Sequence, residues 1–199
     1  GFLDRKHEGR FDLQICHETG GRADLILQAH DGIPPEILEQ GFDRNCGWLL
    51  DQFESRLFKQ PADVVVLALQ PCITDLLWRH KEKGYFFQPD PDWEKNWSLT
   101  QKQWLKDSFL PAGLLRAGEF EACFQSLVRM IKEHLDARVL VFNCSSFDPE
   151  DQTFRYGGMA NDPRAVRAHK FNLALMEISA LEGISIIDID RIVGELGTD

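Results

Sequence analysis

The hydrophobic positions of the chain fall into two alternating kinds of pattern, short apolar runs and longer amphipathic stretches. Four runs are typical of buried strands. The first, at residues 11–16, alternates in period two, and the second, at 63–69, is a continuous valine-rich run typical of a parallel strand. The third and fourth lie at 138–142 and 184–189. Because enough residues for a crossover helix separate successive runs, the pattern predicts an α/β fold with a mostly parallel sheet.

The stretches between the later runs have the spacing of amphipathic helices. Apolar residues recur every three or four positions over residues 120–135, with charged residues on the opposite face. A second helix is predicted to start at Asp162 as N-cap, with Pro163 in the first turn, and to end at Gly183. Both helices are expected to pack their apolar stripes on the sheet.

Two stretches depart from this regular alternation. A helix is predicted over residues 35–59, with Gly41 and Gly47 weakening its continuity. The long stretch at 74–118 carries four of the five tryptophans and several prolines. A loop of that length is uncommon in a compact domain unless it covers or binds something. We therefore interpret residues 74–118 as an aromatic-rich insertion in one domain that spans residues 1–199.

Composition and charge narrow the range of partners. The chain has 32 acidic and 22 basic residues, a formal net charge of −10, and this balance argues against nucleic acid. Hydrophobic residues make up 43% of the chain, enough for a globular core. No apolar run approaches the roughly 18 residues of a membrane span, and the first residues are charged, unlike a signal peptide.

The five cysteines are an odd number with no Cys-x-x-Cys pair. They are interpreted as reduced thiols of an acidic cytoplasmic protein, several of them buried. Their spacing does not match the paired ligands of a structural zinc site, so we expect no structural zinc. No pattern in the sequence calls for another cofactor.

Polar residues follow each of the predicted strands. In an open parallel sheet, ligands bind at the carboxyl ends of the strands, so these residues are expected to converge. In chain order they are His17, Gly20, Gly21, Gln70, Asp75, Asn143, Ser145, Ser146, Asp188 and Asp190.

The order of these pieces resembles the SGNH (GDSL) hydrolase family, a flavodoxin-like, three-layer α/β/α fold of esterases, lipases, sugar O-acetylesterases and acyltransferases. The likeness covers about residues 11–196. It rests on the glycine-bearing turn at 15–21, the strands at 63–70 and 139–143, and the helix and strand at 171–188. The resemblance implies hydrolysis or transfer of an acyl group on a small-molecule or glycan ester by serine chemistry.

Some blocks of that family have no counterpart in the sequence. The serine of its Gly-Asp-Ser turn and its terminal Asp-x-x-His pair are missing, and residues 70–75 replace its Gly-x-Asn-Asp. We expect either a domain that lacks its first strand and last helix, or chemistry done in another way. The alternative function is a non-catalytic SGNH-like module that binds a ligand or a protein partner.

The candidate catalytic groups divide into oxyanion donors and proton carriers. The backbone N–H groups of Gly20 and Gly21 and the carboxamides of Gln70 and Asn143 are the candidate oxyanion donors. Gln70 is the first choice, taking the place of the family asparagine, although a strand-end glutamine is often only a structural hydrogen bonder.

Proton transfer is assigned to His17, which could serve Ser145 or Ser146 as general base, with Glu18 or Asp75 orienting it. The structural alternative is a solvated turn histidine. Cys72 and Cys144 are read as nucleophiles or as small buried hydrophobes. Asp188 and Asp190 with Asp75 suit either a magnesium-like cation or helix capping.

The aromatic insertion has three interpretations. As a lid, it would place Trp78 and its neighbours over an acyl or glycan ligand, since tryptophan stacks on sugar rings. As a satellite core, the same rings would pack under a long loop. As an exposed patch, they would bind a protein partner.

Overall fold

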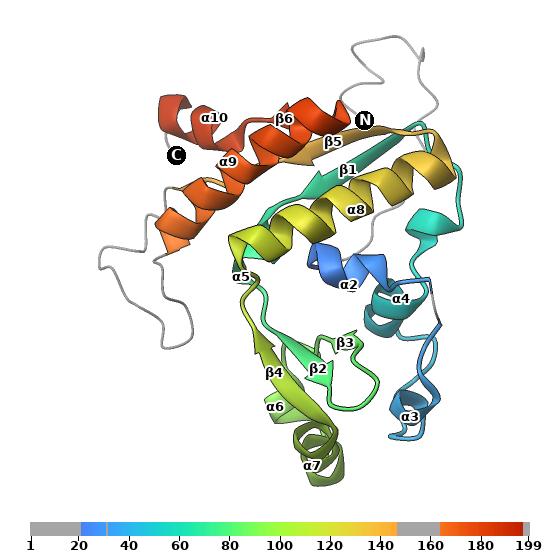
Figure 1. Cartoon of the computed structure of the whole chain (residues 1–199). Coiled ribbons are helices and arrows are strands. Elements are labelled where there is room, and N and C mark those ends of the chain that lie inside the picture. The colour runs from blue at the N-terminus through green and yellow to red at the C-terminus, as the bar shows by residue number, and fades with distance from the viewer. Residues whose placement is uncertain (1–20, 31, 147–163, 197–199) are drawn as a thin grey trace.

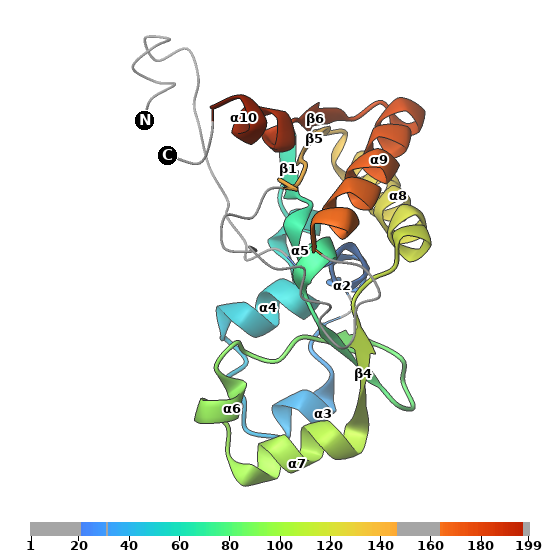
Figure 2. The ribbon, with the colours of Figure 1, turned by 90° about the vertical axis from the view of Figure 1, so that its left-hand side faces the viewer.

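The computed structural model describes residues 21–30, 32–146 and 164–196, which form two three-stranded sheets (Figure 1). The parallel sheet consists of β1 (Val64–Ala68), β5 (Arg138–Phe142) and β6 (Ser185–Ile187) in the order β1-β5-β6. The antiparallel sheet consists of β2 (Leu77–His80), β3 (Phe86–Phe87) and β4 (Phe109–Gly113) in the order β3-β2-β4. Figure 2 shows the first sheet in the upper part of the molecule and β4 of the second in the lower part.

The parallel sheet confirms the α/β expectation and three of its four predicted strands. In register, Val65 faces Val139 across β1 and β5, and Val141 faces Ile186 across β5 and β6. The predicted strand at residues 11–16 lies outside the described residues. Short runs of valine and isoleucine form these strands because branched side chains suit a pleated, buried surface.

Two helices of 19 residues each cover one face of the parallel sheet. They are α8 (Ala117–Leu135) and α9 (Arg164–Glu182), close to the ranges that the apolar stripes predicted. Gly183 follows α9 with a φ of +62°, a left-handed conformation that favours glycine at a helix end. The predicted helix start at Asp162 and Pro163 lies outside the described residues.

The opposite face of the parallel sheet is much more open. Val64 and Val66 of β1 are 46% and 51% exposed, whereas Val65 between them is 6% exposed. The helix α10 (Ile189–Leu196) lies on this side, as Figure 2 shows, and contributes no buried residue. The described residues therefore form a mixed α/β structure whose packed helices lie on one face of the sheet.

The stretch at residues 74–118 is folded and does not form a loop. After β2 and β3 come α6 (Trp93–Asn96) and α7 (Leu99–Ser108), and β4 closes the antiparallel sheet beside β2. Ser98 starts α7 with a capping box, accepting from Gln101 N while the Gln101 side chain accepts from Ser98 N. This antiparallel sheet packs one face on an aromatic cluster.

The continuous helix predicted over residues 35–59 is wrong. Three short elements stand in its place: α3 (Pro35–Leu38), α4 (Gly47–Phe53) and the 3₁₀ turn η1 (Arg56–Phe58). Gly41 has a φ of +81°, which reverses the chain after α3 and which a helix cannot contain. Two further short helices, α2 (Ala23–Leu27) and α5 (Gln70–Thr74), lie beside the parallel sheet.

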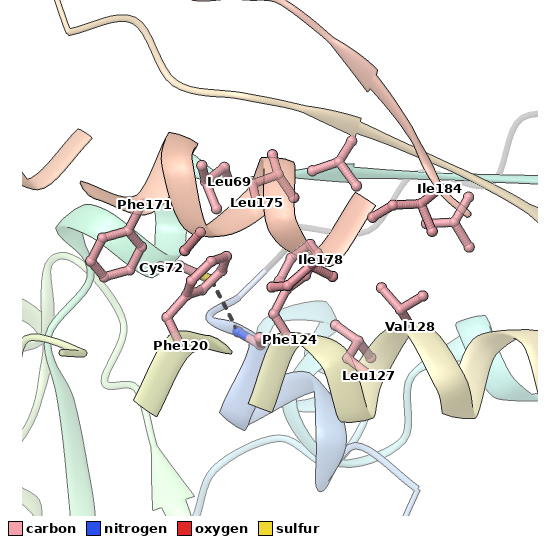
Figure 3. Close-up of a cluster of buried hydrophobic side chains, with 14 of the residues drawn as sticks. Leu69, Cys72, Phe120, Phe124, Leu127, Val128, Phe171, Leu175, Ile178 and Ile184 are labelled. Carbon is pink, nitrogen blue, oxygen red and sulfur yellow. Dashed lines mark hydrogen bonds between the residues drawn. The ribbon is translucent and has the colours of Figure 1, made fainter. Parts of the chain in front are cut away.

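The described residues form two hydrophobic cores. The larger one lies between α8, α9 and the parallel sheet, and Figure 3 shows Phe120, Phe124 and Phe171 facing one another within a mainly aliphatic cluster. The smaller one is aromatic, and it joins the antiparallel sheet and α7 to α3 and α4. Its buried members are Ile37, Leu49, Phe53, Phe87, Trp97, Leu105 and Phe109.

Two buried arginines bind the segments that connect the two cores. Arg22 donates to the carbonyl oxygens of Asp75 and Gly113 at 3.3 and 2.6 Å. Arg167 of α9 donates to the carbonyl oxygens of Ile73 and Leu115 at 3.0 and 2.9 Å. Residues 73–75 lead into the antiparallel sheet and residues 113–115 lead out of it. Each arginine therefore links the segment that enters the antiparallel sheet to the segment that leaves it.

No helix in the described part of the chain is long and apolar enough to cross a membrane.

Candidate functional site

The carboxyl edge of the parallel sheet carries a network of polar side chains, centred on Asn143 directly after β5. Its carboxamide nitrogen donates to Asp188 Oδ1 at 2.8 Å, and its carboxamide oxygen accepts from Asp190 N at 3.1 Å. The structure thus brings together residues 143–146 and 188–190, as expected for neighbouring parallel strands. Both ends of the Asn143 carboxamide are engaged within the protein, so in this state it acts as a brace between β5 and β6.

The two aspartates of this edge hold the start of α10 and the turn after β5. Asp188 Oδ1 accepts from Arg191 N at 3.1 Å, the contact of a helix cap. Asp190 Oδ1 accepts from both the backbone N and the hydroxyl of Ser146, at 2.7 and 2.9 Å. The capping interpretation therefore describes Asp188, whereas Asp190 binds the turn after β5.

Gln70 differs from Asn143 in having an unoccupied carboxamide. It is the first residue of α5, one residue after Leu69, whose backbone N donates to Phe142 O at 3.0 Å and so continues the ladder between β1 and β5. The Gln70 side chain is exposed, and its carboxamide makes no hydrogen bond to another described residue. Gln70 is therefore the strand-end donor that remains available to a ligand.

Gly21, two residues before α2, lies against the same edge. Ala23 N donates to the Cys72 thiol of α5 at 3.4 Å, which places Gly21 beside the residues that follow β1. A Cβ on Gly21 would lie 2.8 Å from Leu25 Cδ2, so the turn packs too closely for a larger residue without a shift. His17 and Gly20 lie outside the described residues.

Asp75 and Trp78 belong to the beginning of the insertion. The Asp75 carboxylate accepts from Thr74 Oγ1 at 3.0 Å and from Gln88 Nε2 at 3.3 Å. Burial raises the pKa of Asp75 despite these hydrogen bonds. Trp78 of β2 packs edge-on against Trp93 at 6.3 Å between ring centroids. Both side chains are engaged with the insertion, and no described contact links them to Asn143.

The tryptophans of the insertion mostly point inward. Trp97 is 8% exposed and lies 6.1 Å from Phe87 and 4.8 Å from Phe42, measured between ring centroids. Trp104 packs edge-on against Phe109 at 5.2 Å. The satellite-core interpretation describes these rings, which line the second core.

The cysteines near the strand ends are protonated thiols at neutral pH. Burial raises the pKa of Cys72 to about 12 and also raises the pKa of Cys144. Because the thiolate is the nucleophile, neither residue is poised for attack. The described cysteines, Cys46, Cys72, Cys123 and Cys144, are free of disulfides.

The described residues hold no group of three or more His, Cys, Asp or Glu side chains arranged for a metal ion. Asp188 and Asp190 are occupied by Asn143, Ser146 and backbone N–H groups. Asp75, the third carboxylate of the hypothetical cation site, is bound to Thr74 and Gln88.

Sequence reasoning missed the residues that support this edge. Asn172 of α9 accepts from Cys144 N at 3.1 Å and donates to Cys144 O at 2.8 Å, and so fixes the turn after β5. Arg167 stands in the apolar stripe of α9, one turn before Phe171, with its guanidinium 5.1 Å from that ring. A charge in an apolar stripe is the signal that could have identified it, whereas Arg22 gives no such signal.

Comparison of the chain with family models, curated proteins and solved structures gave no match.

Proposed function

We propose that the carboxyl edge of the parallel sheet is the oxyanion side of an acyl-ester site, in a hydrolase or acyltransferase of SGNH type. A single observation carries the proposal: Gln70 presents a free carboxamide at the start of α5, beside the ladder between β1 and β5. An oxyanion donor must be fixed at its backbone and free at its tip, because it stabilises charge only as the transition state forms. Gln70 meets both conditions, and Asn143 meets only the first.

In this proposal the other strand-end residues have separate tasks. Asn143 braces β5 against β6, and Asp190 fixes the backbone of Ser146. Ser145 and Ser146 remain the alternative nucleophiles, with His17 as the general base. Asp75 is tied to Gln88, which leaves Glu18 as the candidate to orient His17. The glycine turn at residues 20–21 adds a backbone donor.

The proposed fold is a three-layer α/β/α sandwich of flavodoxin-like type. Two observations support this fold. The parallel strands follow one another in the order β1-β5-β6, with helices between them, as a flavodoxin-like sheet requires. One face of the sheet is packed under α8 and α9, and the other is open and lined by Val64 and Val66. Parallel sheets are generally covered on both faces, so an open apolar face calls for a further layer. Under this proposal, the site binds a small-molecule or glycan ester.

The proposal is tested by the turnover of p-nitrophenyl acetate by the purified chain and its Gln70→Ala variant. Loss of one oxyanion donor typically lowers kcat about 10²- to 10³-fold. KM should change little, because the donor acts mainly on the transition state. Gln60→Ala is the matched control, since Gln60 is an exposed glutamine just before β1.

Three results can be distinguished. A loss of kcat in Gln70→Ala alone supports the oxyanion role. Equal turnover in both variants would remove Gln70 from the mechanism. No turnover by the unaltered chain would overturn the enzyme proposal and leave the non-catalytic, ligand-binding alternative.

A further inference from the structure

The outward face of the antiparallel sheet carries two apolar residues that the fold covers incompletely, the half-buried Phe86 and the exposed Leu110. Arg79 on the central strand β2 pairs directly with Phe86 of β3 and with Leu110 of β4, so the three side chains form one row on one face. On the opposite face, His80 and Phe109 turn into the aromatic core and are 9% and 1% exposed. Leu110 is 57% exposed. A sheet packed on one side normally places polar residues on the other, so this row needs an explanation.

This row forms one wall of a hollow of about 690 Å³. Leu115 and Cys123 also line it, as do Arg22 and Asp24. Its lining combines apolar side chains with charged ones of both signs, so a ligand that fits it needs both an apolar part and a charged group. It shares no residue with the strand-end edge described above.

The cations that line the hollow differ in how many of their N–H groups already donate hydrogen bonds within the protein. Arg22 is paired with Asp24 through two contacts, Nε to Oδ1 at 3.1 Å and NH2 to Oδ2 at 2.6 Å. The Lys81 ammonium caps α7, donating to the carbonyl oxygens of Lys106 and Asp107. These two cations are therefore occupied within the protein.

Arg79 keeps more free donors than Arg22 or Lys81. Its Nε donates to Gly84 O at 3.1 Å, and its two terminal nitrogens make no hydrogen bond to another described residue. Glu119 and Glu82 also line the hollow, and Glu119 is engaged by Arg116 N at 2.9 Å. These carboxylates disfavour a ligand with several negative charges. A guanidinium flanked by Phe86 and Leu110 instead suits one carboxylate on an apolar body.

We propose that this hollow binds an amphiphilic monocarboxylate, with Arg79 holding the carboxylate while Phe86 and Leu110 contact the apolar body. The two terminal N–H groups of Arg79 match the two carboxylate oxygens. Phe86 and Leu110 flank Arg79 in the register of the sheet. Covering the exposed Leu110 contributes most of the apolar gain, because Arg22 already lies over the Phe86 ring at 6.0 Å. This site is independent of the proposed ester chemistry.

The test compares three probes by isothermal titration calorimetry on the whole chain: 1-naphthoate, its neutral amide 1-naphthamide, and acetate. Naphthoate is expected to bind about ten-fold or more tightly than naphthamide, because a charge-assisted hydrogen bond is worth roughly one factor of ten. Acetate, which has no apolar body, is expected not to bind measurably.

Arg79→Gln should remove the preference for naphthoate over naphthamide. Leu110→Ser should weaken both naphthyl probes by a similar factor. Arg44→Gln is the matched control, because Arg44 is a largely exposed arginine that does not line the hollow. Arg79 and Leu110 are both exposed, so these variants should keep the tryptophan fluorescence of the folded chain.

The binding measurements either support or overturn the proposed monocarboxylate site. Selective binding of naphthoate that is lost in Arg79→Gln and kept in Arg44→Gln supports the site. Absence of naphthoate binding, equal binding of naphthoate and naphthamide, or binding that survives in Arg79→Gln would overturn it.

Discussion

The two cores of this molecule are built from different side chains and from different kinds of sequence. The core under the parallel sheet is mainly aliphatic and comes from two long helices and three strands that are regular in period. The aromatic core comes from short elements between residues 35 and 113. Some of its rings meet edge-on, as Phe87 and Trp104 do at 6.0 Å, and others are tilted, as Phe87 and Phe109 are at 5.4 Å. Long amphipathic elements can bury a stripe each, whereas short elements need large side chains to bury enough area. Arg22 and Arg167 tie the two cores together at the same two connections.

The largest expected effect is that of Phe87→Ala in the aromatic core. Phe87 is fully buried and contacts the rings of Trp48, Trp97 and Phe109. Its truncation should lower the free energy of unfolding by about 3–5 kcal/mol, as for other buried aromatic residues. Urea denaturation measures this loss through tryptophan fluorescence, since all five tryptophans lie between residues 48 and 104.

Phe124→Ala in the aliphatic core is the comparison for that measurement. Phe124 belongs to α8, is 1% exposed, and its side chain points toward α9 (Figure 3), so its loss should fall in the same range. A cost below about 1 kcal/mol for Phe87→Ala alone would show that the aromatic cluster is not a core.

A smaller effect is expected from Arg167→Met, which breaks the connection between the cores. The substitution leaves the carbonyl oxygens of Ile73 and Leu115 without this donor and should cost about 2–3 kcal/mol. It should also separate two unfolding transitions that coincide in the unaltered chain. Tryptophan fluorescence follows the aromatic core, and circular dichroism follows mainly the long helices α8 and α9.

Arg129→Met is the control for this experiment, because Arg129 is an exposed arginine on α8 that pairs with Glu182 at 2.7 Å. It should change stability little, as exposed ion pairs do. Coincident transitions in Arg167→Met would refute the role of the arginine as a link between the cores.

The smallest effect is expected from Asp75→Asn at the start of the insertion. Burial raises the pKa of Asp75, so the folded protein holds its proton more tightly than the unfolded chain does. Its ionisation therefore destabilises the fold as the pH rises through the raised pKa. At pH 7 the variant should melt at a higher temperature than the unaltered chain.

The difference in Tm should shrink as the pH falls toward the ordinary carboxyl pKa of 3.8, because the proton is then bound in both states. Thermal melts at several pH values measure this difference. A variant that melts lower at pH 7 would show that the hydrogen bonds from Thr74 and Gln88 outweigh the cost of burying the charge.

The elements around the aliphatic core were predicted well from the sequence, because their hydrophobic residues recur with a regular period over long stretches. Residues 138–142 and the stripe at 120–135 show clear spacing, and both elements formed there. The helix expected over 35–59 failed because Gly41 has a positive φ, which no periodicity reveals. The antiparallel sheet was missed because β3 has only two residues, too few to show alternation.

The sequence predicted where part of the candidate site lies, but it did not predict which of its residues bind one another. The rule for parallel sheets correctly brought Asn143, Ser146, Asp188 and Asp190 to one edge. Their mutual hydrogen bonds could not be predicted, since each depends on side-chain directions that the sequence does not encode locally. The roles of Asn143 as a brace and Gln70 as the free carboxamide emerge only from those contacts.

The most direct test of the ester-site proposal is intact mass spectrometry of the purified chain after treatment with a fluorophosphonate. The reagent phosphonylates an activated serine, and the adduct mass counts the reacted sites. The account predicts a single adduct that maps to Ser145 or Ser146 and forms more slowly in Gln70→Ala. An unchanged mass after prolonged treatment would contradict it.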